Sequence, residues 1–348
     1  MRLRLFGTHT GLRVSEQVLG TANFGQRWGY GADLATSTKI LNKYAEAGGN
    51  FLDCADVYQF GESEEFLGQI LAGRRDQFVI ATKYTQASSP NAGVLATGNS
   101  RLTMRLSVEG SLKRLRTDRI DLYWVHFADG MTPIEEIMIG LEDLVRSGKI
   151  LYAGLSNFPA WRAARGATIA EVRGWSRLAG LQFEHSLVQR SSEHELLLAG
   201  QALGLGMASW SPLGGGLLSG KYRRGEKGRL EALGGAVFQK EDSAQRTAIV
   251  DATLAIAAEL GVSPAEVAVA WVLSKDTLPI IGPRTVDQLD SYLTASRVVL
   301  SADHLKRLDT VSAIAPIFPY SMIDTQEMQQ VAAGGQLSRV VLPAKVIA

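Results

Sequence analysis

Short apolar runs of strand length recur eight times along the chain, and stretches with the helical spacing of apolar residues separate them. The apolar runs cover residues 17–22, 50–55, 77–83, 120–126, 151–156, 178–184, 205–210 and 278–282. The helical stretches lie near residues 34–48, 63–73, 101–116, 133–147, 159–171, 192–203, 243–260 and 286–294. This alternation predicts parallel strands, because a parallel connection needs a crossover segment.

Local signals agree with the expected helix boundaries. Ser100, Pro133 and Ser263 stand where helices should begin, as N-capping residues and proline in a first turn do. Gly148 and Gly204 stand where helices should end.

The strands read as continuous apolar runs, which is typical of strands covered on both faces. We therefore expect an α/β fold with a closed (β/α)8 TIM barrel rather than two domains. One domain would span residues 1–348, with a barrel core at 17–312 and a tail at 313–348. Two short apolar segments around a polar turn within the first sixteen residues predict an N-terminal β-hairpin that caps the barrel bottom.

Three segments exceed a short connection: residues 84–100, residues 212–243 and the stretch after Ser312. We expect them to supply extra loops and helices at the C-terminal face of the barrel. Segment 221–243 is polar and rich in glycine, which fits a loop that closes over a ligand, with a merely solvated loop as the alternative. The tail contains Phe318, Tyr320 and Met322.

The charges balance: 36 Lys and Arg residues face 35 Asp and Glu residues, for a net charge of +1. Nucleic acid is therefore not an expected partner. The 46% hydrophobic content is typical of an ordinary globular protein. No apolar run approaches the ~20 residues of a membrane span, and no signal peptide is recognisable, so we expect a cytoplasmic protein without a membrane partner.

Metal and disulfide chemistry are not expected. Cys54 is the single cysteine, so it can form neither an intrachain disulfide nor a thiolate cluster. The histidines are scattered and show no ligand spacing; they are His9, His126, His185, His194 and His304.

Polar residues end three of the predicted strands, where a barrel places its reacting groups. Asp53 closes the second strand and is followed by Tyr58, Lys83 closes the third, and His126 closes the fourth. A phenol of pKa ~10 is a poor acid at neutral pH until a nearby ammonium favours its anion. Lys83 would supply that charge and Asp53 would hold Lys83. A neutral His126 could hydrogen-bond a substrate oxygen, so the set predicts proton transfer to a carbonyl.

Residues 50–58, which read NFLDCADVY, together with Gly61, Ser63 and Glu64, resemble the signature of the aldo-keto reductases. Five further segments resemble that family in the same order: the histidine strand, the carboxamide-binding strand end, the following strand, the cofactor loop and the adenosine-phosphate segment. They lie at 120–126, 148–158, 182–187, 210–222 and 281–288, and the resemblance covers about residues 2 to 310.

The resemblance implies a bacterial-type, NADP-dependent oxidoreductase. Tyr58 would be the general acid, tuned by Asp53, Lys83 and His126, while a nicotinamide cofactor delivers hydride. The enzyme would reduce an aldehyde or ketone to an alcohol, or oxidise a secondary alcohol. The alternative is a nucleotide-binding redox-sensing or channel-associated regulatory subunit with little turnover.

The resemblance also implies a cofactor site. Trp210 would lie against the nicotinamide, and Arg284 would meet a 2′-phosphate, which favours NADP(H), with NAD(H) as the alternative. Where the family often has an acid and an amide against adenine, this chain has Ser291 and Tyr292. The expected cofactor residues are Gly20, Thr21, Ser156, Asn157, Gln182, Trp210, Ser211, Pro212, Leu213, Gly215, Lys221, Gly282, Arg284 and Gln288, with Thr285 as a companion of Arg284.

Aromatic residues near the expected opening predict an apolar pocket that tolerates rings. Trp28 and Phe127 are the expected substrate contacts. The resemblance also implies a C-terminal loop that sets substrate specificity, which Phe318, Tyr320 and Met322 would form. Tyr30, Tyr84 and Trp124 are further candidates, with ordinary packing as the alternative for each.

Overall fold

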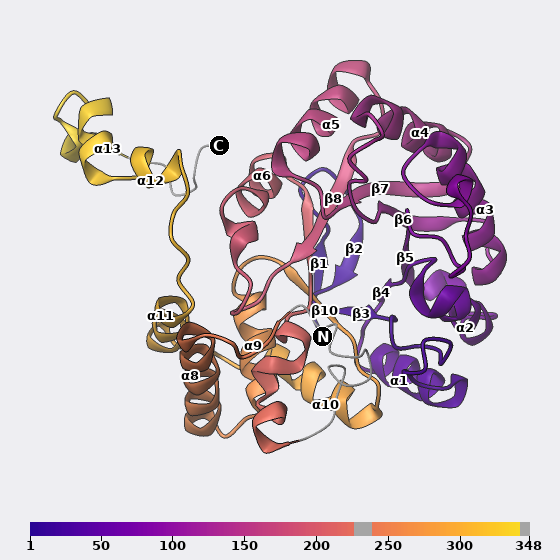
Figure 1. Cartoon of the computed structure of the whole chain (residues 1–348), viewed down its shortest axis with the longest axis horizontal. Coiled ribbons are helices and arrows are strands. Elements are labelled where there is room, and N and C mark those ends of the chain that lie inside the picture. The colour runs from indigo at the N-terminus through magenta and orange to yellow at the C-terminus, as the bar shows by residue number, and fades with distance from the viewer. Residues whose placement is uncertain (226–238, 342–348) are drawn as a thin grey trace.

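A computed structural model describes residues 1–225 and 239–341 and contains a closed barrel of eight parallel strands (Figure 1). The strands follow one another around the barrel in chain order, and β10 pairs with β3 to close it. The predicted α/β barrel is therefore confirmed. The strands are β3 (Val18–Gly20), β4 (Phe51–Asp53), β5 (Val79–Tyr84), β6 (Ile120–Val125), β7 (Ile150–Ser156), β8 (Leu178–Glu184), β9 (Gly206–Trp210) and β10 (Leu278–Ile281).

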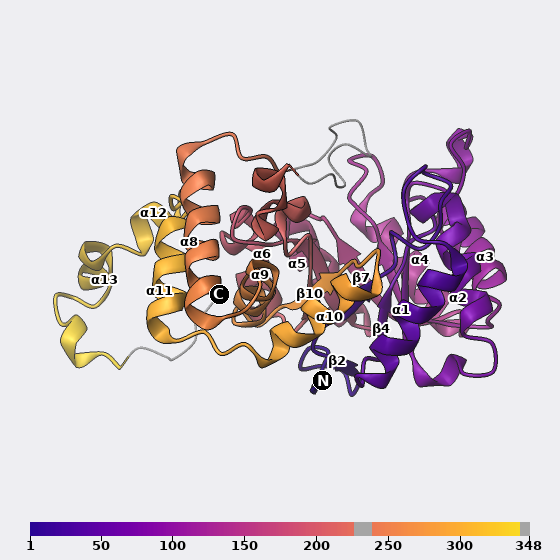
Figure 2. The same ribbon diagram turned by 90° about the horizontal axis from the view of Figure 1, so that it is seen from below.

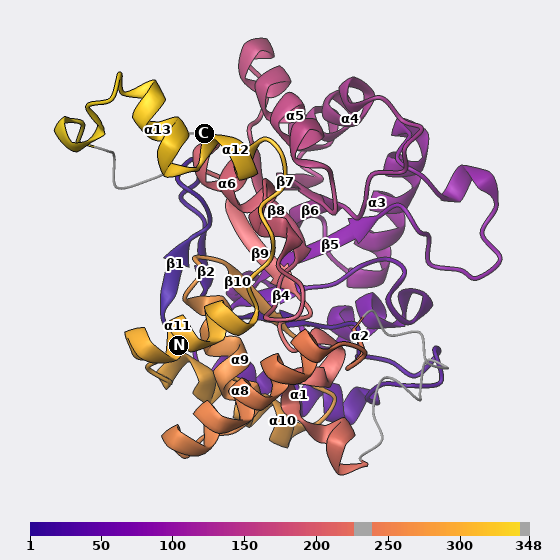
Figure 3. The same cartoon turned by 60° about the vertical axis from the view of Figure 1, so that its left-hand side comes forward.

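Helices surround the barrel, and all eight predicted helical stretches contain one (Figure 1). They are α1 (Leu34–Glu46), α2 (Glu62–Ile70), α3 (Arg101–Leu115), α4 (Ile134–Arg146), α5 (Ala160–Arg173), α6 (Leu196–Ala202), α8 (Ala244–Leu260) and α10 (Val286–Thr294). Two further helices, α9 (Pro264–Leu273) and α11 (Ala302–Val311), lie beside α8 (Figure 3).

The predicted hairpin is confirmed and closes the bottom of the barrel (Figure 2). Its strands, β1 (Leu3–Leu5) and β2 (Arg13–Ser15), pair antiparallel. Phe6 follows β1 and meets the ring of Phe51 at 5.5 Å and that of Trp124 at 6.2 Å. A Cβ atom at Gly180 or Gly206 would lie 2.5 Å from the Phe6 ring. Glycine at both positions therefore leaves room for the Phe6 ring at the bottom of the barrel.

Alternation along β5 sends neighbouring side chains to opposite faces of the sheet. Lys83 points into the barrel, where it reaches Asp53 and Tyr58. Tyr84 is buried on the other face, where its ring stacks on that of Tyr123 at 5.3 Å. The strand thereby supplies one residue to the site and the next to the packing against helices.

The tail leaves the barrel after α11. Two short helices, α12 (Tyr320–Ile323) and α13 (Gln326–Ala332), project away from the barrel (Figures 1 and 2). Phe318 is 76% exposed, and Val331 is 66% exposed. Residues 342–348 of the expected tail, and residues 226–238 of the expected closing loop, lie outside the described residues.

No single helix within residues 1–225 and 239–341 has the length and apolar character to cross a membrane. Helices α8 and α9 meet that test only when taken together, and they are bent by 100°.

Candidate active site

The ends of β4 and β5 bring Asp53 and Lys83 together, and the turn after β4 adds Tyr58. The Lys83 Nζ atom donates to Asp53 Oδ2 at 2.6 Å and to the Tyr58 hydroxyl at 3.0 Å. It also donates to the backbone oxygen of Cys54 at 2.8 Å. The ammonium group is fully buried, and these three oxygen atoms replace its lost hydration.

The electrostatics of this group favour a charged lysine and a protonated tyrosine. Burial alone would lower the pKa of Lys83, but Asp53 and Tyr58 raise it above its ordinary value. Burial raises the pKa of the Tyr58 phenol, and the Lys83 ammonium opposes that shift without cancelling it. At neutral pH, Tyr58 therefore holds a proton directly beside a positive charge.

His126 follows β6 and faces Tyr58 edge-on, with the two ring centroids 6.0 Å apart. Burial holds the pKa of His126 well below its ordinary value, and the Lys83 charge lowers it further. The imidazole is therefore neutral at physiological pH. Its Nδ1 atom is buried and has no hydrogen-bond partner among the described residues.

These side chains border a cavity of about 470 Å³ at the carboxyl ends of the strands. Asp53, Tyr58 and His126 form part of its wall, and both expected substrate residues, Trp28 and Phe127, line it. Ten of the expected cofactor residues also line it: Gly20, Asn157, Gln182, Trp210, Ser211, Pro212, Leu213, Gly215, Lys221 and Gly282. Gln288 is an eleventh.

The ends of β7, β8 and β9 form one hydrogen-bonded group. Asn157 Nδ2 donates to Ser156 Oγ and to the backbone oxygen of His126, each at 2.9 Å. The Trp210 indole donates to Asn157 Oδ1 at 2.9 Å. Gln182 Nε2 donates to Asp53 Oδ1 at 2.8 Å. The Asn157 backbone amide donates to the backbone oxygen of Gln182 at 2.8 Å, so Gln182 connects the other expected nicotinamide residues to the carboxylate that holds Lys83.

A turn of three glycines follows β9 and forms part of the cavity wall. Gly214, Gly215 and Gly216 all have positive φ angles, between 55° and 95°. A Cβ atom on Gly216 would lie 2.8 Å from Cε of Lys221. Glycine thus lets the backbone amides and the Lys221 side chain share one small region, as a phosphate cradle requires.

Three expected cofactor residues lie behind or beside the cavity wall. Thr21 is buried, and its hydroxyl donates to the backbone oxygen of Asp53 at 3.1 Å. Ser156 is buried under Asn157. Arg284 lies against the ring of Tyr30, which does line the cavity.

Two aromatic candidates are corrected by the structure. Tyr84 is fully buried on the outer face of the sheet, because it follows the inward-pointing Lys83. Trp124 is fully buried inside the barrel and packs on Phe6 from the hairpin, below the site. Phe318, Tyr320 and Met322 do not line the cavity either, because the tail projects away from the barrel.

Sequence reasoning missed several lining residues on loops, namely Ala22, Asn23, Val57 and Gln86.

The loop between β3 and α1 is held in place by Gln59, which follows Tyr58. Gln59 Nε2 donates to the backbone oxygen atoms of Ala22 and Tyr30, and Gln59 Oε1 accepts from the Trp28 amide at 2.8 Å. The available signal was the position of this loop directly after a strand end.

Comparison with known proteins decides the family. Residues 17–313 match the model of the Aldo/keto reductase family. The chain belongs to this family. Among aldo-keto reductase relatives, the uncharacterized oxidoreductase YrpG of Bacillus subtilis is 40% identical over 87% of this chain and 93% of its own length.

Two relatives carry more specific names. Norsolorinic acid reductase stcV of Emericella nidulans is 35% identical over 94% of this chain and 86% of its own. The NADP(+) aryl-alcohol dehydrogenase of Phanerodontia chrysosporium is 34% identical over 92% of this chain and 88% of its own.

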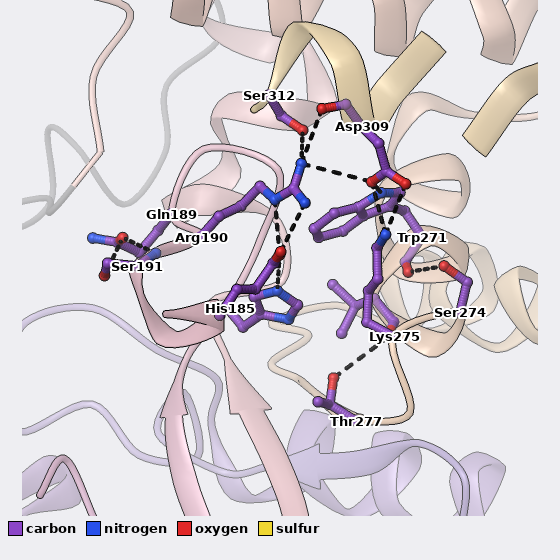
Figure 4. A network of polar contacts seen from close by, with 12 residues as sticks. His185, Gln189, Arg190, Ser191, Trp271, Ser274, Lys275, Thr277, Asp309 and Ser312 are labelled. Atoms are coloured by element: carbon purple, nitrogen blue, oxygen red, sulfur yellow. Dashed lines mark hydrogen bonds and ion pairs between the residues drawn. The ribbon is translucent and has the colours of Figure 1, made fainter. Parts of the chain in front are cut away.

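A polar network outside the cavity fastens the β8 side of this aldo-keto reductase (Figure 4). Arg190 pairs with Glu193 at 2.7 Å and donates to Ser312 Oγ at 2.8 Å. His185 Nε2 and Glu193 Oε1 are 2.8 Å apart. Burial would raise the pKa of Glu193, but His185 and Arg190 lower it to about 2. The network ties the segment after β8 to the end of α11 (Figure 4) and so stabilises the strand that carries Gln182.

Proposed function

We propose that this aldo-keto reductase is an NADP(H)-dependent oxidoreductase that interconverts an aldehyde or ketone and an alcohol, with Tyr58 as the general acid or base. The contact of 3.0 Å between the Tyr58 hydroxyl and the buried Lys83 ammonium carries this proposal. It puts a proton donor beside a fixed positive charge at the wall of a cavity that also holds His126.

Each of the four side chains has a defined task in reduction. Tyr58 gives its proton to the developing alkoxide, and Lys83 stabilises the phenolate that remains. Asp53 holds Lys83 in place at 2.6 Å. The neutral His126 orients the carbonyl oxygen by hydrogen bonding. In oxidation, Tyr58 returns to its protonated form by accepting the alcohol proton.

The residues present fit a nicotinamide dinucleotide, which supplies the hydride when bound. Asn157 and Gln182 would hold the carboxamide, and Trp210 would cover one face of the ring. The glycine turn at 214–216 would receive the pyrophosphate through its backbone amides. Arg284 would bind a 2′-phosphate, which favours NADP(H) over NAD(H).

An aromatic carbonyl compound or alcohol is the proposed substrate class. Trp28 and Phe127 both line the cavity that holds the reacting groups. The Trp28 ring lies edge-on to Tyr58, with centroids 6.2 Å apart. The name of one relative, an aryl-alcohol dehydrogenase, supports the same class.

Tyr58→Phe tests the proposal, with Tyr152→Phe as the matched control outside the cavity lining. We expect the Tyr58 variant to lose turnover of an aromatic aldehyde by about 100-fold or more, because the proton donor is removed. Binding of NADPH, followed by quenching of tryptophan fluorescence, should stay within about twofold in both variants.

Retained turnover in Tyr58→Phe would remove Tyr58 from its proposed role. NADPH binding without turnover of any carbonyl or alcohol by the unmodified protein would instead favour the regulatory subunit as its function. The presence of all four side chains in contact or facing one another supports the enzyme.

A further inference from the structure

Arg284 is held by an aromatic ring instead of by a carboxylate. Its guanidinium carbon lies 4.5 Å from the centroid of the Tyr30 ring. Within residues 1–225 and 239–341, no Asp or Glu oxygen lies within ion-pair distance of Arg284. Arg27, on the same loop as Tyr30, differs in this respect because it pairs with Glu65 at 2.7 Å.

The kind of partner decides what the arginine can still bind. A carboxylate would occupy the N–H groups at the edge of the guanidinium and neutralise its charge. An aromatic ring contacts only the face, so the in-plane N–H donors and the positive charge remain available to an anion. The stack therefore restricts the motion of Arg284 without competing for the ligand.

Tyr30 can do this because its own position is fixed. Its backbone oxygen accepts from Gln59 Nε2 at 2.9 Å. A Cβ atom on the next residue, Gly31, would lie 1.9 Å from the backbone oxygen of Gly25, so the loop is folded closely on itself. Tyr30 also lines the cavity together with Gln288 and Tyr292.

Gln288 fixes the other side of the contact. Its Oε1 atom accepts from the Arg284 backbone amide at 2.8 Å, at the start of α10. Backbone and side chain of Arg284 are thus restrained by two different elements. The contact joins the loop after β3 to the segment after β10. These two strands are neighbours in the closed barrel.

We propose that Tyr30 is a positioning residue for cofactor selection, which holds the Arg284 guanidinium ready for the 2′-phosphate of NADP(H). This inference rests on the proposed NADP(H) function. Loss of the ring would leave Arg284 charged but free to sample many rotamers, and each binding event would then have to order it. The binding affinity should decrease for ligands that carry the 2′-phosphate and stay unchanged for ligands that lack it.

Two fragments that cannot reach the nicotinamide region provide the test. Adenosine 2′,5′-bisphosphate and adenosine 5′-monophosphate are titrated calorimetrically into the full chain and into Tyr30→Leu, Tyr30→Phe and Arg284→Ala. We expect Tyr30→Leu to weaken the bisphosphate about tenfold and to leave the monophosphate unchanged. Tyr30→Phe keeps the ring and should bind both fragments as the unmodified protein does.

The double variant isolates the contact. In the Arg284→Ala background, Tyr30→Leu should cause no further loss of bisphosphate affinity, because its effect acts through Arg284. Additive losses would overturn the inference. Equal weakening of both fragments by Tyr30→Leu would also overturn it, since Tyr30 would then contact adenosine or support the loop in general.

The same titrations separate this inference from the proposed function. If the unmodified protein binds the bisphosphate no more tightly than the monophosphate, and Arg284→Ala changes neither affinity, the proposed NADP(H) preference itself is wrong. If Arg284→Ala abolishes the preference and Tyr30→Leu preserves it, only the role of Tyr30 is wrong.

Discussion

Asp56 is a buried carboxyl group two residues before Tyr58 that the proposed chemistry does not use. Its Oδ1 atom has no hydrogen-bond partner among the described residues. Burial and the nearby Glu64 raise the pKa of Asp56 to about 8, although Arg114 opposes that shift. Asp56 is therefore mostly protonated at neutral pH.

Asp56→Asn should make stability less dependent on pH. A carboxyl group whose pKa is higher in the folded state loses its contribution to stability as pH rises toward the folded value. We therefore expect the variant to gain about 3 to 4 kcal/mol relative to the unmodified protein between pH 5 and pH 8. Urea denaturation at both pH values measures this difference.

Asp118→Asn is the control, since the Asp118 side chain is 91% exposed. It should change the free energy of unfolding equally at the two pH values. If Asp56→Asn behaves as this control does, the carboxyl group is ionised in the folded protein.

Residues at strand ends could be predicted from the alternation of strands and helices, whereas loop residues were found only where a sequence motif marked them, as for Tyr58. Asp53, Lys83 and His126 end apolar runs, and the barrel brings such ends together. The position of Gln86 depends on the path of a loop, which no periodicity encodes. For Tyr84 the alternative of ordinary packing holds, because one step along a strand reverses the face, even beside a site residue.

Helix α3 carries two arginines whose ion pairs differ in burial. Arg114 pairs with Glu64 at 2.7 Å, with side-chain exposures of 19% and 0%, and joins α3 to α2. Arg101, at the start of the same helix, pairs with Asp143, and both side chains are about half exposed. Solvent screening should make these pairs unequal in energy.

Arg114→Met should destabilise the protein by about 3 to 5 kcal/mol, because it leaves the Glu64 carboxylate buried without its counter-charge. Arg101→Met, on the same helix, should cost at most about 1 kcal/mol. Urea denaturation of both variants at pH 7 gives the comparison. Equal losses would mean that burial of the Arg114 pair has no energetic consequence.

The α-helices and strands within residues 1–225 and 239–312 followed from periodicity, except for two helices. Helix α9 was not among the predicted stretches because Ala265 and residues 267–272 are all buried, so the helix shows no continuous polar face. Only its capping residue Ser263 marked its start. Helix α11 was also missed, although Leu305, Leu308 and Val311 recur along it at helical spacing and pack on the same core cluster.

At the scale of the whole molecule, barrel and tail differ in how they are held. From residue 320 to residue 340, the backbone hydrogen bonds of the described chain stay within the tail. Helices α12 and α13 are far shorter than the ~12 residues at which isolated helices become stable in water. The barrel could be predicted because eight strand–helix units support one another, whereas residues 320–340 of the tail make no backbone hydrogen bond to the barrel.

Limited proteolysis should therefore cut the tail first. We expect early cleavage between residues 313 and 325, with a barrel fragment that still binds NADPH, because no described tail residue lines the cavity. Mass spectrometry locates the cut, and fluorescence quenching follows the binding. Loss of NADPH binding in step with cleavage would show that the tail contributes to the site.

The loop between β3 and α1 makes one contact to the proposed catalytic residues and another to the proposed cofactor site. Trp28 lies beside Tyr58 and Tyr30 lies on Arg284, two residues apart on a backbone that Gln59 clamps. A directed-evolution library that randomises this loop to widen the substrate range would therefore disturb coenzyme choice at the same time. Libraries at Phe127, on a separate loop, would let an engineer change one property and keep the other.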